Sequence, residues 1–252
     1  MAKIIAITNQ KGGVGKTTTS VNLSASLAAA GKRVLLIDLD PQANATMGSG
    51  TDKRTIQLTV YHILLGEKRI KEVSVNATQG KYDLVPANRD LAGAEVEMVD
   101  LDKRETRLKA ALTEVNNDYD YVLIDCPPAL NLLTLNGLCA AHTVMIPMQC
   151  EYYALEGLSD LVNTIKKVRV SFNPKLHIEG LLRTMFDPRN ILAQQVSEQL
   201  QKHFGNKVYQ TIIPRNVRLA EAPGFGIPVL YHDKNSKGAQ AYLALAKELL
   251  NT

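Results

Sequence analysis

A glycine-rich stretch near the start of the chain carries the residues best suited to chemistry. It reads Lys-Gly-Gly-Val-Gly-Lys-Thr over residues 11–17 and follows an apolar run at 4–7. Glycines let backbone N–H groups wrap around an anionic phosphate, and the positive end of a following helix points to the same place. Lys16 would reach the β- and γ-phosphates of a nucleotide, and the Thr17 hydroxyl would ligate Mg²⁺. The spacing therefore predicts a phosphate-binding loop.

The loop departs from the ordinary pattern at one position. A glycine is expected five positions before Gly15, but Gln10 stands there and is followed by a second lysine, Lys11. Two lysines would crowd the phosphates of one nucleotide, because Lys16 and Mg²⁺ already serve them. We therefore expect Lys11 to point outward, into the nucleotide of a second subunit facing the first. There it would stabilise charge on the transferring phosphoryl group, as an arginine finger does.

Two further motifs give the chain a family resemblance. Asp-Leu-Asp-Pro-Gln stands at 38–42, after the second predicted strand, and Leu-Ile-Asp-Cys-Pro-Pro stands at 123–128. With the loop, which is a deviant Walker A motif, these segments resemble those of the ParA/MinD ATPases, and most closely the chromosomal ParA (Soj) branch. Three C-terminal segments also resemble ParA/Soj sequences, at 151–158, 184–190 and 213–226. The resemblance therefore covers nearly the whole chain.

The elements that must position these motifs alternate between strand and helix. Predicted strands span 3–8, 33–38, 82–86, 119–125, 143–147 and about 177–182, and predicted helices span 17–30, 155–168, 192–204 and about 236–250, with helical spacing over 90–116. This alternation predicts an α/β fold with a doubly wound, mostly parallel sheet, helices on both faces, and ligands at the carboxyl ends of the strands. Because no repeat or composition break divides the chain, we expect a single ParA/MinD-type ATPase domain over 1–252, a P-loop NTPase.

Three aspartates follow strands where Mg·ATP chemistry needs carboxylates. Asp125 ends a buried apolar strand, and a Mg²⁺ reached directly or through water would remove the cost of burying its charge. The resemblance implies that Asp125 is the Walker B-type aspartate and that Asp40 positions or activates the attacking water. For Asp38 the alternatives are a Mg²⁺ ligand, a partner of the Lys16 side chain, or a cap or turn residue. Segments 40–42 and 125–128 are expected to act as switches that report the γ-phosphate.

The resemblance also assigns the residues that bind ATP and act on it. Pro214 would lie against the adenine with an apolar face, and Asn216 would supply hydrogen bonds to it. Without the resemblance, residues 214–216 are only a turn. The implied catalytic residues are Lys11, Lys16 and Asp40. The implied phosphate-binding residues are Lys11, Gly12, Gly13, Val14, Gly15, Lys16, Thr17 and Thr18, in which Gly12 and Gly13 leave room for a second subunit.

Positive charge gathers in the C-terminal third of the chain. The formal net charge is +4, and residues 169–252 hold 11 Lys/Arg against 6 Asp/Glu. Arg189 and Arg218 match family arginines implicated in sequence-independent DNA binding, because phosphates attract guanidinium groups whatever the base. Surface salt bridges are the alternative for both arginines. Arg183 stands where many relatives carry an apolar residue; it joins the basic face or solvates a strand end, and it is left unassigned.

Composition narrows the class of protein. No apolar run approaches the roughly 20 residues that span a bilayer, and no signal peptide is evident at the N-terminus. Cys126, Cys139 and Cys150 lack the CxxC spacing of a metal or redox site, so we expect small buried apolar residues in a reducing cytosol. The same spacing disfavours a nitrogenase-reductase relative, which needs a cysteine pair for a bridging cluster. No chemistry is assigned to the five histidines.

The resemblance implies an ATP-dependent switch for chromosome partitioning. An ATP-bound homodimer would bind double-stranded DNA without sequence preference, and a ParB-type partner would stimulate slow ATP hydrolysis and release the DNA. An influence on replication initiation and the positioning of another cargo stay open. No helix-turn-helix precedes the first strand, so no operator-specific readout is expected. The expected cofactors are ATP and Mg²⁺, and the expected location is cytoplasmic and nucleoid-associated.

The alternative function is a membrane-associated positioning ATPase similar to MinD. That class needs a basic amphipathic C-terminal helix for anionic lipids. The end of this chain has an apolar face, but Lys247 is its only cation and stands next to Glu248. We therefore expect a packed domain helix and no membrane partner.

Overall fold

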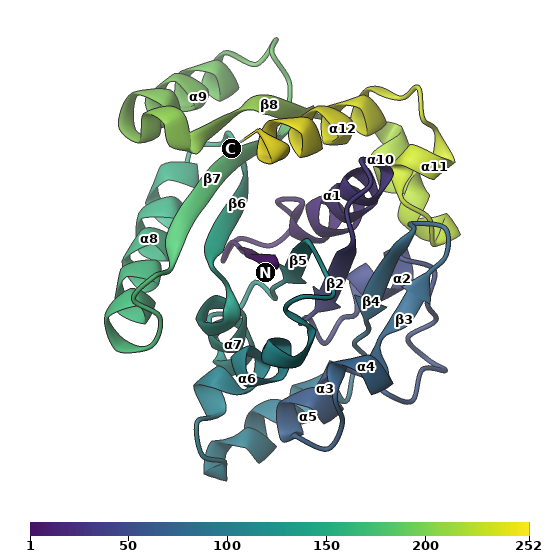
Figure 1. The fold of residues 1–252 in the computed structure, drawn as a ribbon. Helices are drawn as coiled ribbons and strands as arrows, with labels where there is room; N and C mark the ends of the chain where they lie inside the picture. The colour runs from purple at the N-terminus through teal and green to yellow at the C-terminus, as the bar shows by residue number, and fades with distance from the viewer. Residues whose placement is uncertain (252) are drawn as a thin grey trace.

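The fold is built on one sheet, seen in the computed structural model, which describes residues 1–251 (Figure 1). The strands lie in the order β3-β4-β2-β5-β1-β6-β7-β8. Their bounds are β1 Lys3–Ile7, β2 Val34–Asp38, β3 Val75–Ala77, β4 Tyr82–Val85, β5 Tyr121–Asp125, β6 Thr143–Gln149, β7 His177–Phe186 and β8 Val208–Pro214. Only the β3–β4 pair is antiparallel among the described strands. The predicted α/β fold with a mostly parallel sheet is confirmed.

Helices cover both faces of this sheet because successive strand residues point to opposite sides. Ile4 and Ala6 of β1 pack into one apolar cluster, with α3 to α9, whereas Ile5 and Ile7 pack into another, with α1, α2 and α10 to α12. The helix bounds are α1 Lys16–Ala29, α2 Asn44–Gly48, α3 Val60–Leu65, α4 Ile70–Val73, α5 Leu91–Glu97, α6 Arg107–Leu112, α7 Leu132–Ala140, α8 Ala154–Ser171, α9 Ile191–Phe204, α10 Val217–Glu221, α11 Val229–His232 and α12 Lys237–Leu250. The result is the expected doubly wound arrangement.

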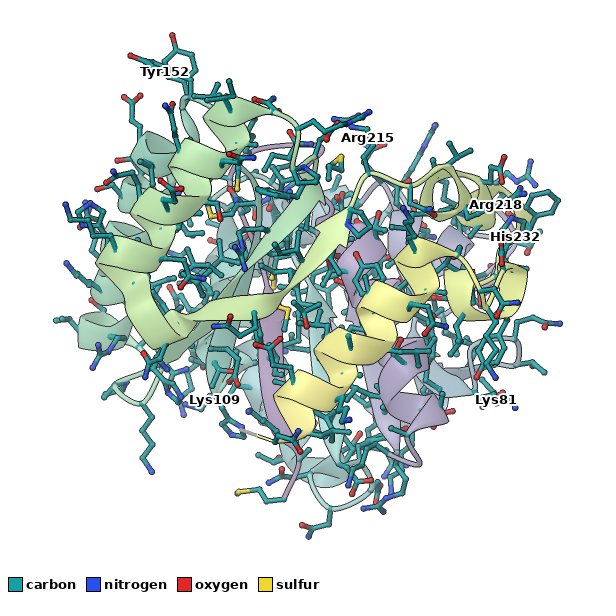
Figure 2. The ribbon with its side chains drawn as sticks, turned by 90° about the horizontal axis from the view of Figure 1, so that it is seen from above. Lys81, Lys109, Tyr152, Arg215, Arg218 and His232 are labelled. Atoms are coloured by element: carbon teal, nitrogen blue, oxygen red, sulfur yellow. The ribbon has the colours of Figure 1, made fainter. Side chains whose placement is uncertain are left out.

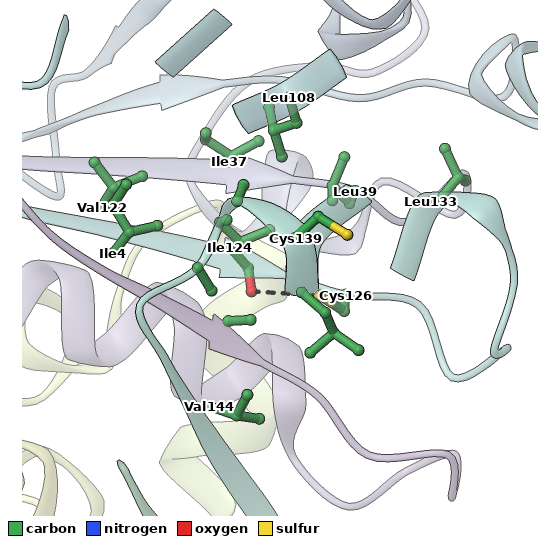
Figure 3. Close-up of a cluster of buried hydrophobic side chains, with 14 of the residues drawn as sticks. Ile4, Ile37, Leu39, Leu108, Val122, Ile124, Cys126, Leu133, Cys139 and Val144 are labelled. Atoms are coloured by element: carbon green, nitrogen blue, oxygen red, sulfur yellow. Dashed lines mark hydrogen bonds between the residues drawn. The ribbon is translucent and has the colours of Figure 1, made fainter. Parts of the chain in front are cut away.

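The three cysteines lie inside this structure and are not paired with one another. Figure 3 shows Cys126 and Cys139 among the branched aliphatic side chains of the first cluster, with Cys126 Sγ 3.9 Å from the Ile124 carbonyl oxygen. Burial raises the pKa of the Cys150 thiol to about 11. The cysteines therefore act as small apolar core residues, as the sequence predicts.

The structure differs from the sequence-based expectation over residues 90–116, at two edge strands, and at the helices α2, α3, α4, α7, α10 and α11, which were not predicted. Residues 90–116 do not form one long helix; α5, α6 and three short 3₁₀ turns, η1 Met98–Asp100, η2 Arg104–Thr106 and η3 Thr113–Val115, divide the segment. The edge strands β3 and β8 were not predicted. No helix among residues 1–251 is long and apolar enough to cross a membrane.

Candidate functional site

The glycine-rich loop joins β1 to α1 and has the backbone conformation of a phosphate cradle. Gly13 and Gly15 adopt φ angles of 72° and 89°, which residues with a side chain rarely adopt, and Gly15 is the N-cap of α1. From β7, the Thr184 hydroxyl donates a hydrogen bond of 2.7 Å to the Val14 carbonyl oxygen. The loop is thereby held against the sheet, next to the free N–H groups at the N-terminus of α1.

The two lysines of the loop occupy different environments. Lys16 is only 7% exposed, and its Nζ donates to the Lys11 carbonyl oxygen over 3.0 Å. Burial lowers the pKa of Lys16, against the opposing effects of Asp125 and Asp40. The Lys11 side chain is about half exposed and forms an ion pair with Glu151, which follows β6. One lysine therefore faces the interior of the loop and the other its outer surface.

Asp125 lies directly against the start of α1. The Thr17 hydroxyl donates to its Oδ2 over 2.8 Å, and Ser20 Oγ lies 2.8 Å from its Oδ1. Burial raises the pKa of Asp125, and the nearby Asp38 carboxylate raises it further. A divalent cation beside this fully buried carboxylate would offset the cost of its charge. Thr17 and Asp125 therefore present the oxygen atoms that a Mg²⁺ site requires.

Asp38 ends β2, Asp40 lies in the loop that follows, and the two carboxylates have different hydrogen-bond partners. Asp38 Oδ2 accepts hydrogen bonds from the Thr46 backbone N–H (2.8 Å) and hydroxyl (2.7 Å), and its Oδ1 accepts the Asp40 N–H. No hydrogen bond joins Asp38 to Lys16 among residues 1–251. Its contacts favour the alternative of a turn residue that shapes the loop. Asp40 is partly exposed, and one of its oxygens accepts the Gln42 N–H over 2.9 Å.

A cavity of about 180 Å³ lies beside the loop and contains the two residues expected at the adenine. Gly15 of the loop and Thr18 of α1 line one side of it, while Pro214 at the end of β8 and Asn216 just after β8 line another. The Asn216 side-chain Oδ1 is buried and has no hydrogen-bond partner. The fold of residues 1–251 therefore leaves this oxygen without a partner. A residue that binds a nucleoside needs such a free hydrogen-bonding group. The fold thus joins segments separated by some two hundred residues.

Three side chains of this site were missed by the sequence analysis. Thr184 ties the loop to β7, Thr46 holds Asp38, and Tyr242 of α12 lines the cavity. Thr184 begins the segment 184–190, which was noted for its resemblance but given no role. Thr46 and Tyr242 stand in stretches without a motif, so only their contacts identify them.

Arg183 requires a correction, because it neither joins a basic face nor solvates a strand end. It is only 6% exposed. One guanidinium nitrogen donates to Ser197 Oγ over 2.8 Å, and another donates to the carbonyl oxygens of Tyr209 (2.7 Å) and Gln210 (3.3 Å). Burial lowers the pKa of Arg183, and the negative charge of Glu248 partly opposes this shift. Arg183 is a framework residue that joins β7 to α9 and β8.

The two arginines expected to bind DNA are exposed, and both already have acidic partners. The Arg189 side chain is 89% exposed and lies 2.8 Å from Asp187. Arg218 lies 2.8 Å from Glu221 and 3.3 Å from Asp233. The salt bridges of the alternative interpretation are therefore present. Surface ion pairs of this kind contribute little to stability, so their cations stay available to a phosphate backbone.

Arg215 is a further exposed arginine of the same region. It makes no hydrogen bond or ion pair within residues 1–251, although its charge adds to that of Arg189 in lowering the pKa of Asp187 to about 2. Figure 2 shows Arg215 and Arg218 reaching outward from the segments that follow β8. The C-terminal third therefore presents several guanidinium groups to solvent.

Comparison with known proteins places this architecture in a family. A family model described as an AAA domain matches residues 2–178. The sporulation initiation inhibitor protein Soj of Bacillus subtilis (strain 168) is 56% identical over 249 residues, covering 99% of this chain and 98% of that protein. The chromosome partitioning protein ParA of Myxococcus xanthus is 53% identical over 251 residues, covering 99% of this chain and 88% of ParA.

Solved structures extend the comparison to ligands. A Mycobacterium smegmatis protein, described as cobyrinic acid a,c-diamide synthase with bound ADP and magnesium, has a TM-score of 0.87 and 39% identity, with 100% of this chain and 95% of that chain covered. The septum site-determining protein MinD of Pyrococcus horikoshii, complexed with Mg-ADP, has a TM-score of 0.80 and 26% identity, with 99% and 96% covered. Structural neighbours of this fold are thus solved with an adenine nucleotide and magnesium, the expected cofactors. MinD shares the fold at lower identity than the ParA and Soj proteins. On its sequence identity over nearly its full length, its parallel sheet and its two-lysine loop, the chain belongs to the Soj/ParA family of chromosome-partitioning ATPases.

Proposed function

We propose that this protein is an ATP-dependent switch that partitions chromosomal DNA. In its ATP-bound state two subunits pair face to face and bind double-stranded DNA without sequence preference. A ParB-type partner then stimulates slow hydrolysis, and the dimer separates from DNA. The observation that carries this proposal is the different placement of the two lysine side chains. Lys16 is buried within its own loop, whereas Lys11 reaches the outer surface. One loop can in this way serve two nucleotides.

ATP and Mg²⁺ would be held by the residues that surround the loop. The loop from Lys11 to Thr18 would bind the phosphates through its backbone N–H groups and Lys16, while Pro214 and Asn216 would contact the base. Thr17 would be the Mg²⁺ ligand, with Asp125 orienting it through the 2.8 Å hydrogen bond. When bound, the metal would supply positive charge that offsets the negative charge of the phosphates.

Two side chains would then act on the hydrolysis step. Asp40 is partly exposed just beyond the carboxyl end of β2, and among residues 1–251 one of its carboxylate oxygens has no hydrogen-bond partner. It would orient the attacking water or accept its proton. Lys11 would exchange Glu151 for the phosphates of the partner's nucleotide. Both Lys11 and Glu151 are about half exposed, so their ion pair costs little to open.

The DNA-binding surface would consist of Arg189 and Arg218, doubled by the second subunit. Each arginine would exchange an acidic neighbour for a DNA phosphate. Contacts to phosphates do not distinguish one base from another. They therefore agree with an affinity for DNA that does not depend on its base sequence. Binding to nucleoid DNA in the cytoplasm would follow from the same surface. Replication initiation would respond to this switch only through DNA or a partner protein.

The MinD-like alternative is disfavoured by the C-terminal helix. The apolar face of α12 packs inside the protein through Tyr242, Leu245 and Leu249, each at most 1% exposed. The carboxylate of Glu248 accepts hydrogen bonds from the backbone of β8. An amphipathic helix that inserts into lipid needs its apolar face free.

The test is DNA binding by the purified protein without nucleotide, with ADP and with ATP, on unrelated duplexes over a salt series. We expect binding only with ATP, equal affinities for all duplexes, and a linear loss of log affinity with log salt. Vesicles containing anionic lipid serve as the parallel assay and should not bind. Absence of DNA binding in every nucleotide state would overturn the proposal. ATP-dependent vesicle binding in its place would favour the MinD-like function.

A further inference from the structure

The pairing between β7 and β8, the last strand of the sheet, contains a shift in register. Leu181 pairs with Val208, but Arg183 pairs with Ile212, so β8 contains two more residues than β7 in this interval. The extra length forms a bulge centred on Tyr209, Gln210 and Thr211. A bulge frees backbone N–H and C=O groups from the ladder, and these groups need other partners when they are buried.

Arg183 supplies the donors that this bulge lacks. Its guanidinium donates to the carbonyl oxygens of Tyr209 and Gln210, at 2.7 and 3.3 Å. A guanidinium offers several N–H donors in a fixed plane, so one side chain can serve two adjacent carbonyl groups. Because Arg183 is nearly fully buried, these hydrogen bonds are shielded from water and its position is well defined.

Glu248 of α12 supplies the matching acceptors. Its Oε1 accepts the N–H of Gln210 over 2.7 Å, and its Oε2 accepts the N–H of Thr211 over 2.9 Å. The bulge is thus held by a cation that binds its carbonyl groups and an anion that binds its N–H groups. We call Arg183 and Glu248 the bulge clamp.

The bulge clamp is connected to the candidate base site through three short segments. β8 continues from the bulge directly into Pro214 and Asn216, which line the cavity. The residue after Arg183 is Thr184, which holds the phosphate-binding loop and lines the same cavity. α12, which carries Glu248, places Tyr242 in the cavity. A shift of the bulge would therefore move the base side of the site.

We propose that Arg183 and Glu248 are positioning residues that determine how tightly this site holds the base of an adenine nucleotide. Neither residue lines the cavity, so both act through the course of β8. The proposal rests on the proposed nucleotide-binding function. It assigns the positioning of the base side to the bulge clamp and phosphate recognition to the glycine-rich loop, with which neither Arg183 nor Glu248 forms a hydrogen bond among residues 1–251.

The test compares two ligands that share a diphosphate and differ in the nucleoside. Affinities for Mg-ADP and Mg-pyrophosphate are measured by calorimetry for the wild type, Arg183→Met and Glu248→Gln. We expect both variants to bind ADP about tenfold more weakly, as the loss of one or two positioned hydrogen bonds implies, and pyrophosphate within about twofold of the wild type. Arg183→Lys, which keeps a single cationic donor group in place of the planar guanidinium, should recover part of the ADP affinity.

Matched controls separate positioning from general damage. Ser197→Ala removes the other hydrogen bond of Arg183 and leaves the bulge contacts, and Lys247→Gln removes a neighbouring charge on α12. Both should bind ADP like the wild type, and thermal unfolding reports whether each variant folds. Unchanged ADP affinity in folded clamp variants, or equal losses for ADP and pyrophosphate, would overturn the proposal. A wild type that binds neither ligand would instead overturn the nucleotide-binding function on which it rests.

Discussion

The phosphate side and the base side of the candidate site are built in different ways. The phosphate side is one continuous stretch of chain, residues 11–18, which comprises part of the loop between β1 and α1 and the first residues of α1. The base side combines Thr184 of β7, the segment after β8 and Tyr242 of α12. A continuous loop with glycines at its positive-φ positions defines much of its own conformation. The base side combines residues from three elements, so its shape depends on how those elements pack. Residues that do not line the cavity therefore influence that shape.

The two sides should therefore respond differently to substitution. On the phosphate side, a variant should affect hydrolysis or subunit pairing directly, because the altered side chain touches phosphate or the partner subunit. On the base side, effects should appear in nucleotide affinity and leave pyrophosphate binding intact. The predictions below test this division.

The largest effect is expected for Lys11→Ala. If Lys11 stabilises charge on the partner's nucleotide, hydrolysis should fall on the order of 10³-fold, as for loss of an arginine finger. Affinity for ADP in the monomer should stay unchanged, because Lys16 serves the same subunit. Phosphate release and ADP calorimetry measure the two quantities. Glu151→Gln, which frees Lys11 from its ion pair, is the control and should keep hydrolysis. Near-normal turnover in Lys11→Ala would remove Lys11 from catalysis.

The next effect is expected for Asp40→Ala. Loss of the residue that orients the attacking water should reduce hydrolysis on the order of 10²-fold. The ATP-bound dimer should persist on DNA, since Asp40 makes no contact with the base side. Sedimentation with ATP and DNA checks the dimer, and Asp52→Ala provides an exposed acidic control. An Asp40→Ala protein that hydrolyses ATP at the wild-type rate contradicts the assignment.

Gly12→Val should separate subunit pairing from nucleotide binding. A Cβ at Gly12 would have no atom of the same chain within 4 Å, and the backbone there does not require glycine, so the variant should fold normally. A bulky side chain at a close subunit contact should weaken ATP-dependent pairing by more than about tenfold. Light scattering with ATP measures pairing. Gly224→Val, whose Cβ is also free of contacts, is the matched control. Normal dimers of Gly12→Val would contradict the proposed face-to-face interface.

Asn216→Ala should produce a smaller loss on the base side. Removal of one hydrogen-bonding side chain should weaken ADP binding by about fivefold, as expected for roughly 1 kcal/mol. Pyrophosphate affinity should not change, which distinguishes this variant from damage to the loop. Equal losses for the two ligands would show that the base side and the phosphate side are not independent.

The smallest effect is expected outside the site, for Arg189→Ala. Loss of one phosphate contact per subunit should lower the slope of log affinity against log salt by about 1 for each contact, without changing ADP affinity. Arg54→Ala is a close control, because Arg54 pairs with Asp52 at 2.8 Å just as Arg189 pairs with Asp187 at 2.8 Å. If both substitutions change DNA binding equally, Arg189 has no special part in it.

Most strands could be predicted from the sequence, but the edge strands could not. Central strands such as β1 and β5 are buried on both faces and read as continuous apolar runs, which is a strong signal. β3 has only three residues, and β8 contains a bulge and leads into Pro214. The segment 90–116 has helical spacing, yet it is divided by turns at which Leu101, with an extended backbone, and Lys103, with a φ of 53°, leave the helical path. Short or interrupted elements are held by their neighbours, so their own sequence carries little signal.

The sequence by itself determined the phosphate-binding loop, the order of the six predicted strands and of the long helices α1, α8, α9 and α12, and the position of Asp125 at the end of a strand. These features are local: glycine spacing, hydrophobic pattern and motif order are properties of adjacent residues. Only the tertiary structure decided that Asp38 holds Thr46, that Lys11 pairs with Glu151, and that Arg183 is buried in a bulge. Such contacts join residues far apart in the chain, and the packing of β7, β8 and α12 selects which polar groups meet.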